Sequence, residues 1–449
     1  MDLPPALTLD QLRNAVQAKR IDTVALALTD MQGRLQGKRL TAPYFLEHVA
    51  SHGSEACNYL LAVDVEMNTV DGYAMSSWER GYGDFELKPD FDTLRLTPWN
   101  EATALCLGDL TWADGSPVVA SPRQILRAQL DRLQQRGLQA FAGTELEFIV
   151  FKDTYEEAFE KGYRDLKPAN QYNVDYSMLG GTRVEPLLRK IRNHMAGAGM
   201  AVESSKGECN DGQHEINFHF GPALRTADEH SIYKTGAKEI AAAEELAITF
   251  MAKYDQREGS SCHIHLSLKR DGAPAFARDE VLFERFVAGQ LACLRELSLC
   301  YAPNVNSYKR FAKGSFAPTA VAWGRDNRTC AVRVVGHGDA LRVELRVPGA
   351  DVNPYLAVAA CIAAGLAGVE RNLKLTAKPI HGTNRGAEDV PRAPRTLIET
   401  TRVFRQSDFA RDWFGDDFVD HFAATREWEW RQWQDAVTDW ELKRYFEII

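Results

Sequence analysis

Charged and imidazole side chains recur at alternate positions within four apolar stretches, at residues 141–151, 212–220, 261–268 and 341–347. Side chains two residues apart in a β-strand point to the same side of a sheet. The polar faces would carry Glu145 and Glu147; Glu215, Asn217 and His219; His263, His265 and Ser267; and Arg342, Glu344 and Arg346, with Glu208 just before the second stretch. One such strand is usually the wet face of an exposed sheet, but four favour a shared cavity.

Carboxylates that face one cavity repel one another and need a cation to balance them. Five glutamates and one histidine, without cysteine, form an oxygen-rich set that suits Mg²⁺ or Mn²⁺ rather than structural zinc. Six ligands exceed what one octahedral ion with bound waters requires, so two ions per site are expected. The candidate metal ligands are Glu145, Glu147, Glu208, Glu215, His263 and Glu344.

Basic residues gather in the last part of this region and alternate there with valine and leucine, which favours an inward-facing basic surface over a solvated charge run. They are Lys309, Arg310, Arg325, Arg328, Arg333, Arg342 and Arg346. Arginine forks suit carboxylate and phosphate oxygens. Arginines opposite a metal-bearing acidic floor suit phosphoryl transfer from a nucleotide. The chain has no Gly-x-x-x-x-Gly-Lys-Ser/Thr motif, so a P-loop fold is excluded.

The elements around these strands predict a small N-terminal part and a large α/β part. Residues 9–19 are expected to form a helix, and residues 23–28 and 34–40 a hairpin. Residues 72–92 are expected to form an irregular surface segment, and residues 104–110 and 118–119 a second strand pair. A helix begins after Ser121 and Pro122 and stops at Gly137. Strands then alternate with helices, two of them at 232–253 and 280–300, to about residue 370. The tail from residue 395 is expected to be helical, and its five tryptophans indicate core packing or a subunit contact rather than a ligand-binding pocket.

Composition bounds the class of protein. Lys and Arg number 53 and Asp and Glu 62, a net charge of −9, which argues against a nucleic-acid or anionic-membrane binder. The N-terminus lacks the basic and apolar regions of a signal peptide. The longest apolar run, residues 356–369, is shorter than the ~20 residues of a spanning helix and is expected to be a buried helix. Eight scattered cysteines suit reduced thiols, and a cytoplasmic location is expected.

Seven motifs, in order along residues 20–370, resemble those of the bacterial-type glutamine synthetase family. They are Gly143-Thr-Glu-Leu-Glu-Phe148, Gly212-Gln-His-Glu215, His263-Ile-His-Leu-Ser267, Asn306-Ser-Tyr-Lys-Arg310, Trp323-Gly-Arg-Asp-Asn-Arg328, Glu344-Leu-Arg-Val-Pro348 and Asn353-Pro-Tyr-Leu356. The resemblance implies an α+β fold: a β-grasp-like domain over residues 1–115 and a catalytic domain with a curved antiparallel sheet over 116–449. It also implies a homo-oligomer, a dodecamer of two hexameric rings with active sites shared between subunits.

The same resemblance implies a role for each motif residue. Glu147, Glu208 and Glu215 would bind the metal that orders the amino-acid substrate, and Glu145, His263 and Glu344 the metal at the nucleotide phosphates. The substrate glutamate would meet Gly259, Arg310 and Arg346, and ATP would meet Glu203, Phe220, His265, Ser267 and Arg342. Arg328 and Arg333 would neutralise the transferring phosphate. Asp30 resembles the aspartate that faces a neighbouring subunit's site and deprotonates the nitrogen nucleophile, although a lone turn aspartate is usually a cap.

Departures from the family pattern predict the nitrogen substrate. Glutamine synthetases carry a flap of the form Pro-Gly-x-Glu-Ala-Pro whose glutamate closes the ammonium pocket, whereas this chain has Lys313-Gly-Ser-Phe-Ala-Pro318. Phe316 therefore replaces a compact ammonium ligand with an apolar wall. The loop before His263 is also altered, to Glu258-Gly-Ser-Ser-Cys, and Glu388 stands where regulated relatives carry an adenylylated tyrosine.

The prediction is an ATP-dependent ligase that joins the γ-carboxylate of glutamate to a primary amine through γ-glutamyl phosphate. Residues 64–68 and 78–84 resemble the γ-glutamylethanolamide synthetase branch, with polyamine, isopropylamine and aniline ligases as near relatives. An ammonia-using glutamine synthetase is the alternative. A catalytically inactive scaffold is a third reading, which the retention of all six expected metal ligands argues against.

Overall fold

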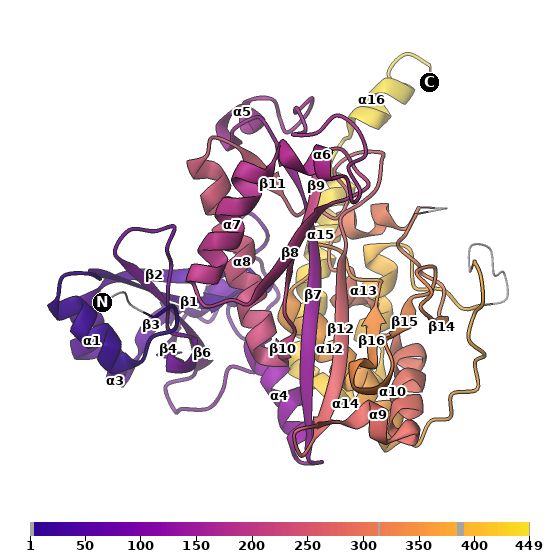
Figure 1. Ribbon diagram of the computed structural model, residues 1–449, viewed down its shortest axis with the longest axis horizontal. Helices are drawn as coiled ribbons and strands as arrows, with labels where there is room; N and C mark the ends of the chain where they lie inside the picture. The colour runs from indigo at the N-terminus through magenta and orange to yellow at the C-terminus, as the bar shows by residue number, and fades with distance from the viewer. Residues whose placement is uncertain (1–3, 313–314, 384–389, 449) are drawn as a thin grey trace.

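Two β-sheets organise the chain, and the computed structural model describes residues 4–312, 315–383 and 390–448 (Figure 1). The first sheet has the order β2-β1-β6-β4-β3, with β5 added beside β6. The pair β1–β6 is parallel and the other pairs are antiparallel. The elements of this part are α1 (Leu9–Gln17), β1 (Thr23–Thr29), β2 (Leu35–Thr41), α2 (Ala42–Tyr44), α3 (Ala50–His52), β3 (Ser54–Cys57), β4 (Asp84–Pro89), β5 (Arg95–Leu96) and β6 (Thr103–Thr111).

The second sheet carries the polar faces predicted above. Its order is β14-β15-β16-β12-β7-β9-β8, with the short strands β10, β11 and β13 at its margins. Among the strands of the described residues, β14–β15 is parallel and the other pairs of this sheet are antiparallel. Its strands are β7 (Leu138–Phe151), β8 (Val202–Gly207), β9 (Gln213–Phe218), β10 (Gly221–Pro222), β11 (Ala247–Thr249), β12 (Cys262–Arg270), β13 (Ala273–Pro274), β14 (Trp323–Arg325), β15 (Val332–Val335) and β16 (Arg342–Leu345).

The register of this sheet aligns the candidate ligands across neighbouring strands. Glu145 pairs with His263, and Glu147 pairs with Glu215. Glu344 stands between His265 on one side and Arg333 on the other. Because directly opposed residues share a face of the sheet, acids, histidines and arginine meet on one surface while the apolar neighbours pack into the core.

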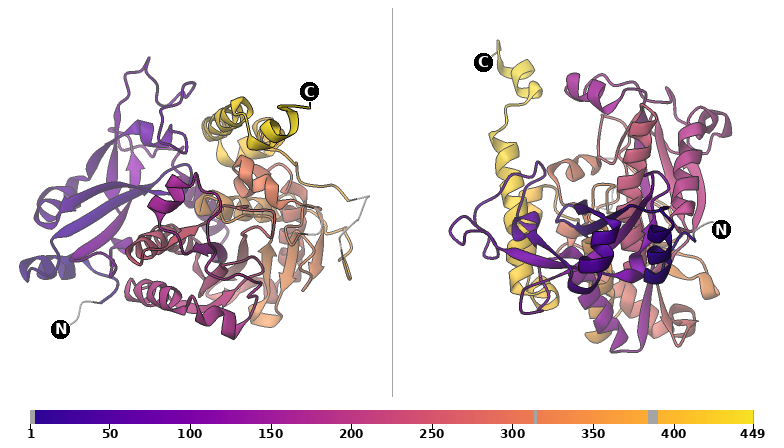
Figure 2. Two further views of the ribbon diagram at one scale, coloured as in Figure 1. Left: turned by 90° about the horizontal axis from the view of Figure 1, so that it is seen from above. Right: turned by 90° about the vertical axis from the view of Figure 1, so that its left-hand side faces the viewer.

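Helices cover the opposite face of the large sheet, and the helix α12 lies at the centre of that layer (Figures 1 and 2). Asn353 caps α12 and Pro354 occupies its first turn, while residues 354–368 are buried. Gly368 lets α10 approach closely, since a Cβ there would lie 2.0 Å from the carbonyl oxygen of Arg285. The helices of this part are α4 (Pro122–Gln134), α5 (Tyr155–Glu160), α6 (Met178–Thr182), α7 (Glu185–Gly197), α8 (Ala223–Ala243), α9 (Ala275–Arg278), α10 (Glu280–Cys293), α11 (Ser298–Tyr301) and α12 (Pro354–Glu370).

The apolar run 356–369 is thus a buried helix, as predicted. In the part of the chain that the structure describes, no helix is both long and apolar enough to cross a bilayer.

The C-terminal tail is helical, as predicted, and returns to the N-terminal part. It comprises α13 (Leu397–Arg405), α14 (Asp408–Phe414), α15 (Asp416–Asp435) and α16 (Asp439–Tyr445). On α15, Nε2 of His421 donates to the carbonyl oxygen of Leu61 at 2.7 Å. Trp413 is buried, and the centre of its ring lies 4.7 Å from the guanidinium carbon of Arg132. Trp440 is 60% exposed on the protruding α16 (Figure 1).

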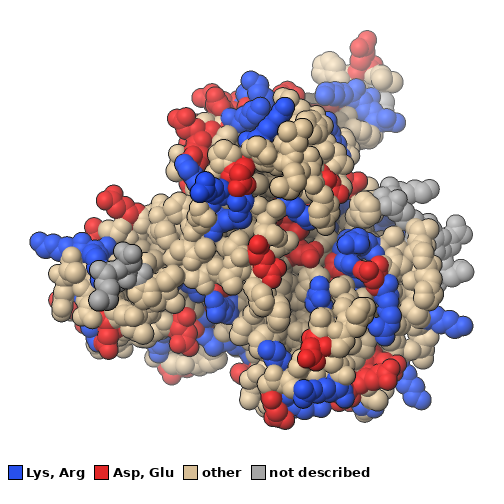
Figure 3. Space-filling model, in the orientation of Figure 1, with Lys and Arg blue, Asp and Glu red and all other residues tan. Residues whose placement is uncertain are grey.

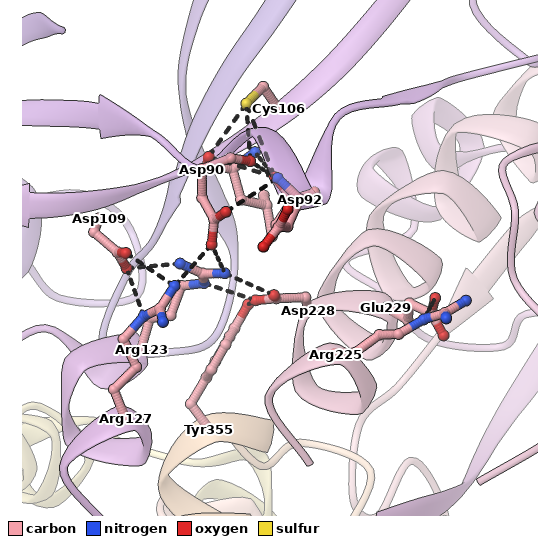
Figure 4. Close-up of polar contacts among 12 residues, drawn as sticks. Asp90, Asp92, Cys106, Asp109, Arg123, Arg127, Arg225, Asp228, Glu229 and Tyr355 are labelled. Atoms are coloured by element: carbon pink, nitrogen blue, oxygen red, sulfur yellow. Dashed lines mark hydrogen bonds and ion pairs between the residues drawn. The ribbon is translucent and has the colours of Figure 1, made fainter. Parts of the chain in front are cut away.

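A buried arginine joins the N-terminal part to the large α/β part (Figure 4). Arg123 of α4 donates to Asp228 of α8 through Nε and Nη2, at 2.9 Å each. It also donates to Asp109 and Asp90 at 2.7 Å each. The hydroxyl of Tyr355 completes the network with a 2.6 Å bond to Asp228. The division predicted between residues 115 and 116, in the turn between β6 and α4, stays a prediction.

The mixed α and β fold is confirmed, but several predicted elements are wrong. The helix expected at 232–253 spans Ala223–Ala243, and the chain then turns at Glu245, whose φ of 55° is left-handed, to form β11. Residues 84–89, expected to be irregular, form β4 because they pair with β3 and β6. Residues 118–119 form no strand, and the helix expected at 280–300 ends at Cys293.

Candidate active site

Two cavities open on the polar face of the large sheet and meet at Glu145 and Asn217, which line both. The first has a volume of about 300 Å³ and the second about 370 Å³. Figure 3 shows acidic side chains recessed near the centre of this face, with basic side chains beside them. The predicted ATP-contacting residues line the first cavity. All predicted metal ligands except the fully buried Glu344 line the second.

The first predicted ligand set, Glu147, Glu208 and Glu215, comes together in the wall of the second cavity. Each offers a carboxylate oxygen, and these oxygens lie within 4.8 Å of one another. Glu147 on β7 is held by the amide nitrogen of Gln213 at 2.9 Å and the backbone N–H of Ser261 at 2.7 Å. Its direction is therefore fixed by two neighbouring segments.

The second predicted set, Glu145, His263 and Glu344, also comes together. Nδ1 of His263 lies 3.1 Å from Glu145 and 3.8 Å from Glu344. The structure adds His265, which offers a ligand atom within 4.8 Å of both carboxylates. Nδ1 of His265 accepts a bond from Arg342 at 3.1 Å, so its Nε2 carries the proton that it donates to Glu145 at 2.9 Å.

Lys206 alone does not offset the three carboxylates of the first set, because the pKa of each of them stays above its ordinary value. Burial and the charge of Glu208 raise the pKa of Glu147 to about 8. Burial and three neighbouring glutamates raise the pKa of Glu215 well above its ordinary range. Burial raises the pKa of Glu208 despite the opposing charge of Lys206. A divalent cation supplies the charge that keeps such carboxylates ionised, so the donor set fits an oxygen-preferring metal.

In the second predicted set, neighbouring side chains offset the charge of the carboxylates. Burial opposes ionisation of Glu145, but its hydrogen bonds with His263 and His265 outweigh that effect and lower its pKa. The pKa of Glu344 is also lowered, because the charges of His263 and Arg346 outweigh burial. Within the described residues, the buried Nε2 of His263 has no hydrogen-bond partner. The imidazole of His263 thus has Nδ1 within 3.8 Å of both carboxylates and Nε2 without a partner among the described residues, an arrangement that fits a metal ligand.

Four arginines line the second cavity, as the sequence predicts for the phosphate and substrate carboxylates: Arg310, Arg328, Arg333 and Arg346. Nη1 of Arg333 contacts Glu344 at 2.8 Å, and Arg346 pairs with the same carboxylate. Arg310 is fully buried and anchored to the carbonyl oxygen of Val347 at 2.9 Å and to Ser261 Oγ at 2.8 Å. Arg328 is exposed at the rim.

The first cavity contains all five residues predicted for ATP: Glu203, Phe220, His265, Ser267 and Arg342. Phe220 is half-exposed and its ring stands edge-on to that of Phe141, with centroids 6.3 Å apart. His219, predicted on the ligand face, instead lies beyond the end of β9 and stacks on Phe220.

Gly259 and Phe316 both line the second cavity. A Cβ on Gly259 would lie 2.4 Å from Cγ of Arg310, so only glycine lets this loop rest on the arginine. The aromatic side chain of Phe316 is 46% exposed. Lys313 and Gly314 of the altered flap, and Glu388, lie outside the described residues.

The structure does not bring Asp30 to either cavity. Asp30 is wholly buried in the turn between β1 and β2, and its carboxylate accepts the backbone N–H groups of Gln32 and Arg34 at 2.9 Å each. Nε of Arg34 contacts the second oxygen at 2.7 Å. Within its own subunit Asp30 therefore acts as a turn cap, and its role toward a neighbouring subunit's site stays a prediction.

The sequence analysis missed Lys206, Asp175 and Tyr176, which line the second cavity, and it gave no role to Gln213, which lines the same cavity and belongs to one of the seven motifs. Lys206 could have been found, because it precedes Glu208 by two residues in an extended segment. Asp175 and Tyr176 carry no such signal, since they belong to an irregular segment placed against β8 by tertiary packing.

Comparisons with known proteins agree with this geometry. Residues 119–445 match the family described as glutamine synthetase, catalytic domain. The chain is 60% identical to the gamma-glutamylethanolamide synthetase GlnA4 of Streptomyces coelicolor, over 99% of this chain and 97% of that protein. It is 38% identical to a glutamate–isopropylamine ligase of a Pseudomonas species, over 98% of each. The ligand-free structure of GmaS superposes with a TM-score of 0.83 at 25% identity, over 96% of this chain and 98% of that one.

Proposed function

Since this chain belongs to the glutamine synthetase family, we propose that it joins the γ-carboxylate of glutamate to a small primary amine, with ATP as co-substrate. The observation that carries the proposal is Phe316 in the wall of the second cavity, where glutamine synthetases place a glutamate. The two relatives described above are a gamma-glutamylethanolamide synthetase and a glutamate–isopropylamine ligase. The sequence identity of this chain to both supports a primary amine over ammonium as the nitrogen substrate.

The reaction has two steps. The γ-carboxylate oxygen of glutamate attacks the terminal phosphorus of ATP, forming γ-glutamyl phosphate and releasing ADP. The neutral amine then attacks the acyl carbon, loses a proton, and expels inorganic phosphate. In the first step Arg333 and Arg328 neutralise charge on the transferring phosphoryl group. Arg310 and Arg346 hold the substrate carboxylates.

Enzymes of this family use ATP and divalent metals. Here Glu147, Glu208 and Glu215 would hold one Mg²⁺ or Mn²⁺, and Glu145, His263 and Glu344 a second. Bound metal of this kind polarises phosphoryl and carboxyl oxygens. Gln213 and the backbone N–H of Ser261 orient Glu147, and Arg342, through His265, orients Glu145.

The ring of Phe316 selects the nucleophile. A carboxylate at this position would bind the compact NH₄⁺ ion and accept a proton from it. The phenyl ring can do neither, but it offers an apolar contact to the carbon atoms of an amine. A double-ring dodecamer with sites shared between subunits belongs to the same proposal, and it would bring a neighbour's N-terminal part to the second cavity.

The test is a steady-state screen of amines for ADP release with glutamate and ATP. Ethanolamine, isopropylamine, putrescine and ammonium each serve as the nitrogen donor, and mass spectrometry identifies the product. One or more primary amines should give a higher kcat/KM than ammonium. A kcat/KM that is by far highest with ammonium would instead establish a glutamine synthetase.

A further inference from the structure

Lys206 is a cation in the wall of the second cavity, among the carboxylates of the first predicted ligand set. It lies on β8 directly across from Glu215 on β9, and its side chain lines the cavity. Its ammonium group contacts the carboxylate of Glu208. Lys206 is thus a tethered positive charge within the carboxylate set that would hold one divalent cation.

A second set of partners for this ammonium group lies beside the first. Its Nζ is 3.8 Å from Oδ1 of Asp175 and 4.7 Å from the centre of the Tyr176 ring. The segment bearing both residues rests on β8, since a Cβ on Gly207 would lie 2.3 Å from the carbonyl oxygen of Val174. The ammonium group of Lys206 is therefore within ion-pair distance of both Glu208 and Asp175.

An ammonium group and a divalent cation against one carboxylate repel each other strongly at such short range. Glu147 is held by an amide and a backbone N–H, and Glu215 accepts the side-chain amide of Asn217 at 3.0 Å. Those neutral donors can remain when a metal binds. The contact between Lys206 and Glu208 is the one that a bound divalent cation would oppose by charge repulsion.

We propose that Lys206 competes with the divalent cation for Glu208 and, when the cation binds, transfers to Asp175 and Tyr176. The inference rests on the metal site of the proposed function. It has two consequences: Lys206 weakens metal binding relative to three carboxylates alone, and metal loading tightens residues 171–177 against β8.

The first test is a Mn²⁺ titration of the full chain, followed by the electron paramagnetic resonance signal of free Mn²⁺. Lys206→Met keeps the length of the side chain and removes its charge, so the Kd of the affected site should fall at least about tenfold. Lys206→Arg keeps the charge and should bind Mn²⁺ as the wild type does. Lys190→Met removes a surface lysine that pairs with Glu244, and it should change nothing. An unchanged or weaker affinity in Lys206→Met would overturn the proposal.

The second test is hydrogen exchange of residues 171–177 with and without Mn²⁺. The wild type should gain protection there on Mn²⁺ binding, and Lys206→Met should not. An equal gain in both proteins would refute the transfer to Asp175 and Tyr176.

Glu147→Gln separates this inference from the proposed function. If Glu147→Gln leaves Mn²⁺ binding intact, the metal assignment and the inference both fail. If it weakens binding while Lys206→Met has no effect, only the role of Lys206 fails. Melting curves of every variant confirm that it is folded.

Discussion

Replacing Arg123 by glutamine tests the contact between the N-terminal and catalytic parts. The Arg123 side chain is only 3% exposed and makes four charge-assisted bonds of 2.7–2.9 Å to Asp228, Asp109 and Asp90. Asp228 is itself buried. Removing one partner of a buried ion pair typically costs about 3–5 kcal/mol, because the remaining charge stays buried without compensation.

Arg127 provides the matched control, since it contacts two of the same carboxylates from a wetter position. It lies 2.7 Å from Asp90 and 3.0 Å from Asp109, but its side chain is 34% exposed. Solvent screens such a pair, so Arg127→Gln should cost about 1 kcal/mol or less. Comparing the two variants separates burial from charge, because both substitutions remove one positive charge.

Differential scanning calorimetry at equal protein concentration measures the difference. With an unfolding entropy of roughly 2.1 cal/mol/K per residue, the whole chain loses about 0.9 kcal/mol of stability per kelvin near its Tm. Arg123→Gln should therefore lower the Tm by about 3–5 °C and Arg127→Gln by about 1 °C. Equal shifts in the two variants would show that the buried network does not hold the two parts together.

Three further predictions concern the site and the pH dependence of stability. Phe316→Glu should raise kcat/KM for ammonium about tenfold and lower it for ethanolamine, as steady-state kinetics will show; an unchanged ratio would remove Phe316 from amine selection. The carboxylate of Asp351 accepts a 2.6 Å hydrogen bond from Ser307 Oγ in the 3₁₀ helix Val305–Arg310, which carries Arg310. Asp351→Asn should therefore raise KM for glutamate about tenfold with little change in kcat, as steady-state kinetics will show. Burial lowers the pKa of His421 to about 4. Between pH 4 and the unfolded pKa of about 6.5, the unfolded chain binds a proton at His421 that the folded chain does not, so the free energy of unfolding falls as pH falls. From pH 7 to pH 5, urea unfolding should show that the wild type loses about 2 kcal/mol more of this free energy than His421→Gln.

The strand pattern predicted much of the site because its signal is local. Alternation in residues 141–151 and 261–268 fixes which side chains share a face, and the register of β7 and β12 then sets Glu145 against His263. The buried helix at residues 354–370 could also be predicted from the sequence, since its apolar residues surround the helix axis on all sides.

The parts that were missed depend on tertiary contacts. The turn at Glu245 has no glycine or proline to mark it, and β11 exists because residues 247–249 pair with β7. The segment 84–89 reads as irregular until β3 and β6 lie on either side of it. Lys206 and Asp175 are 31 positions apart and meet only because the segment before α6 packs on β8.

A competition experiment tests the central claim most directly. The wild-type enzyme receives glutamate, ATP and equal concentrations of ethanolamine, isopropylamine, putrescine and ammonium, and mass spectrometry quantifies the products at low conversion, where their ratios equal the ratios of kcat/KM. The account predicts that the γ-glutamylamide of a primary amine exceeds glutamine. Glutamine as the dominant product would contradict it.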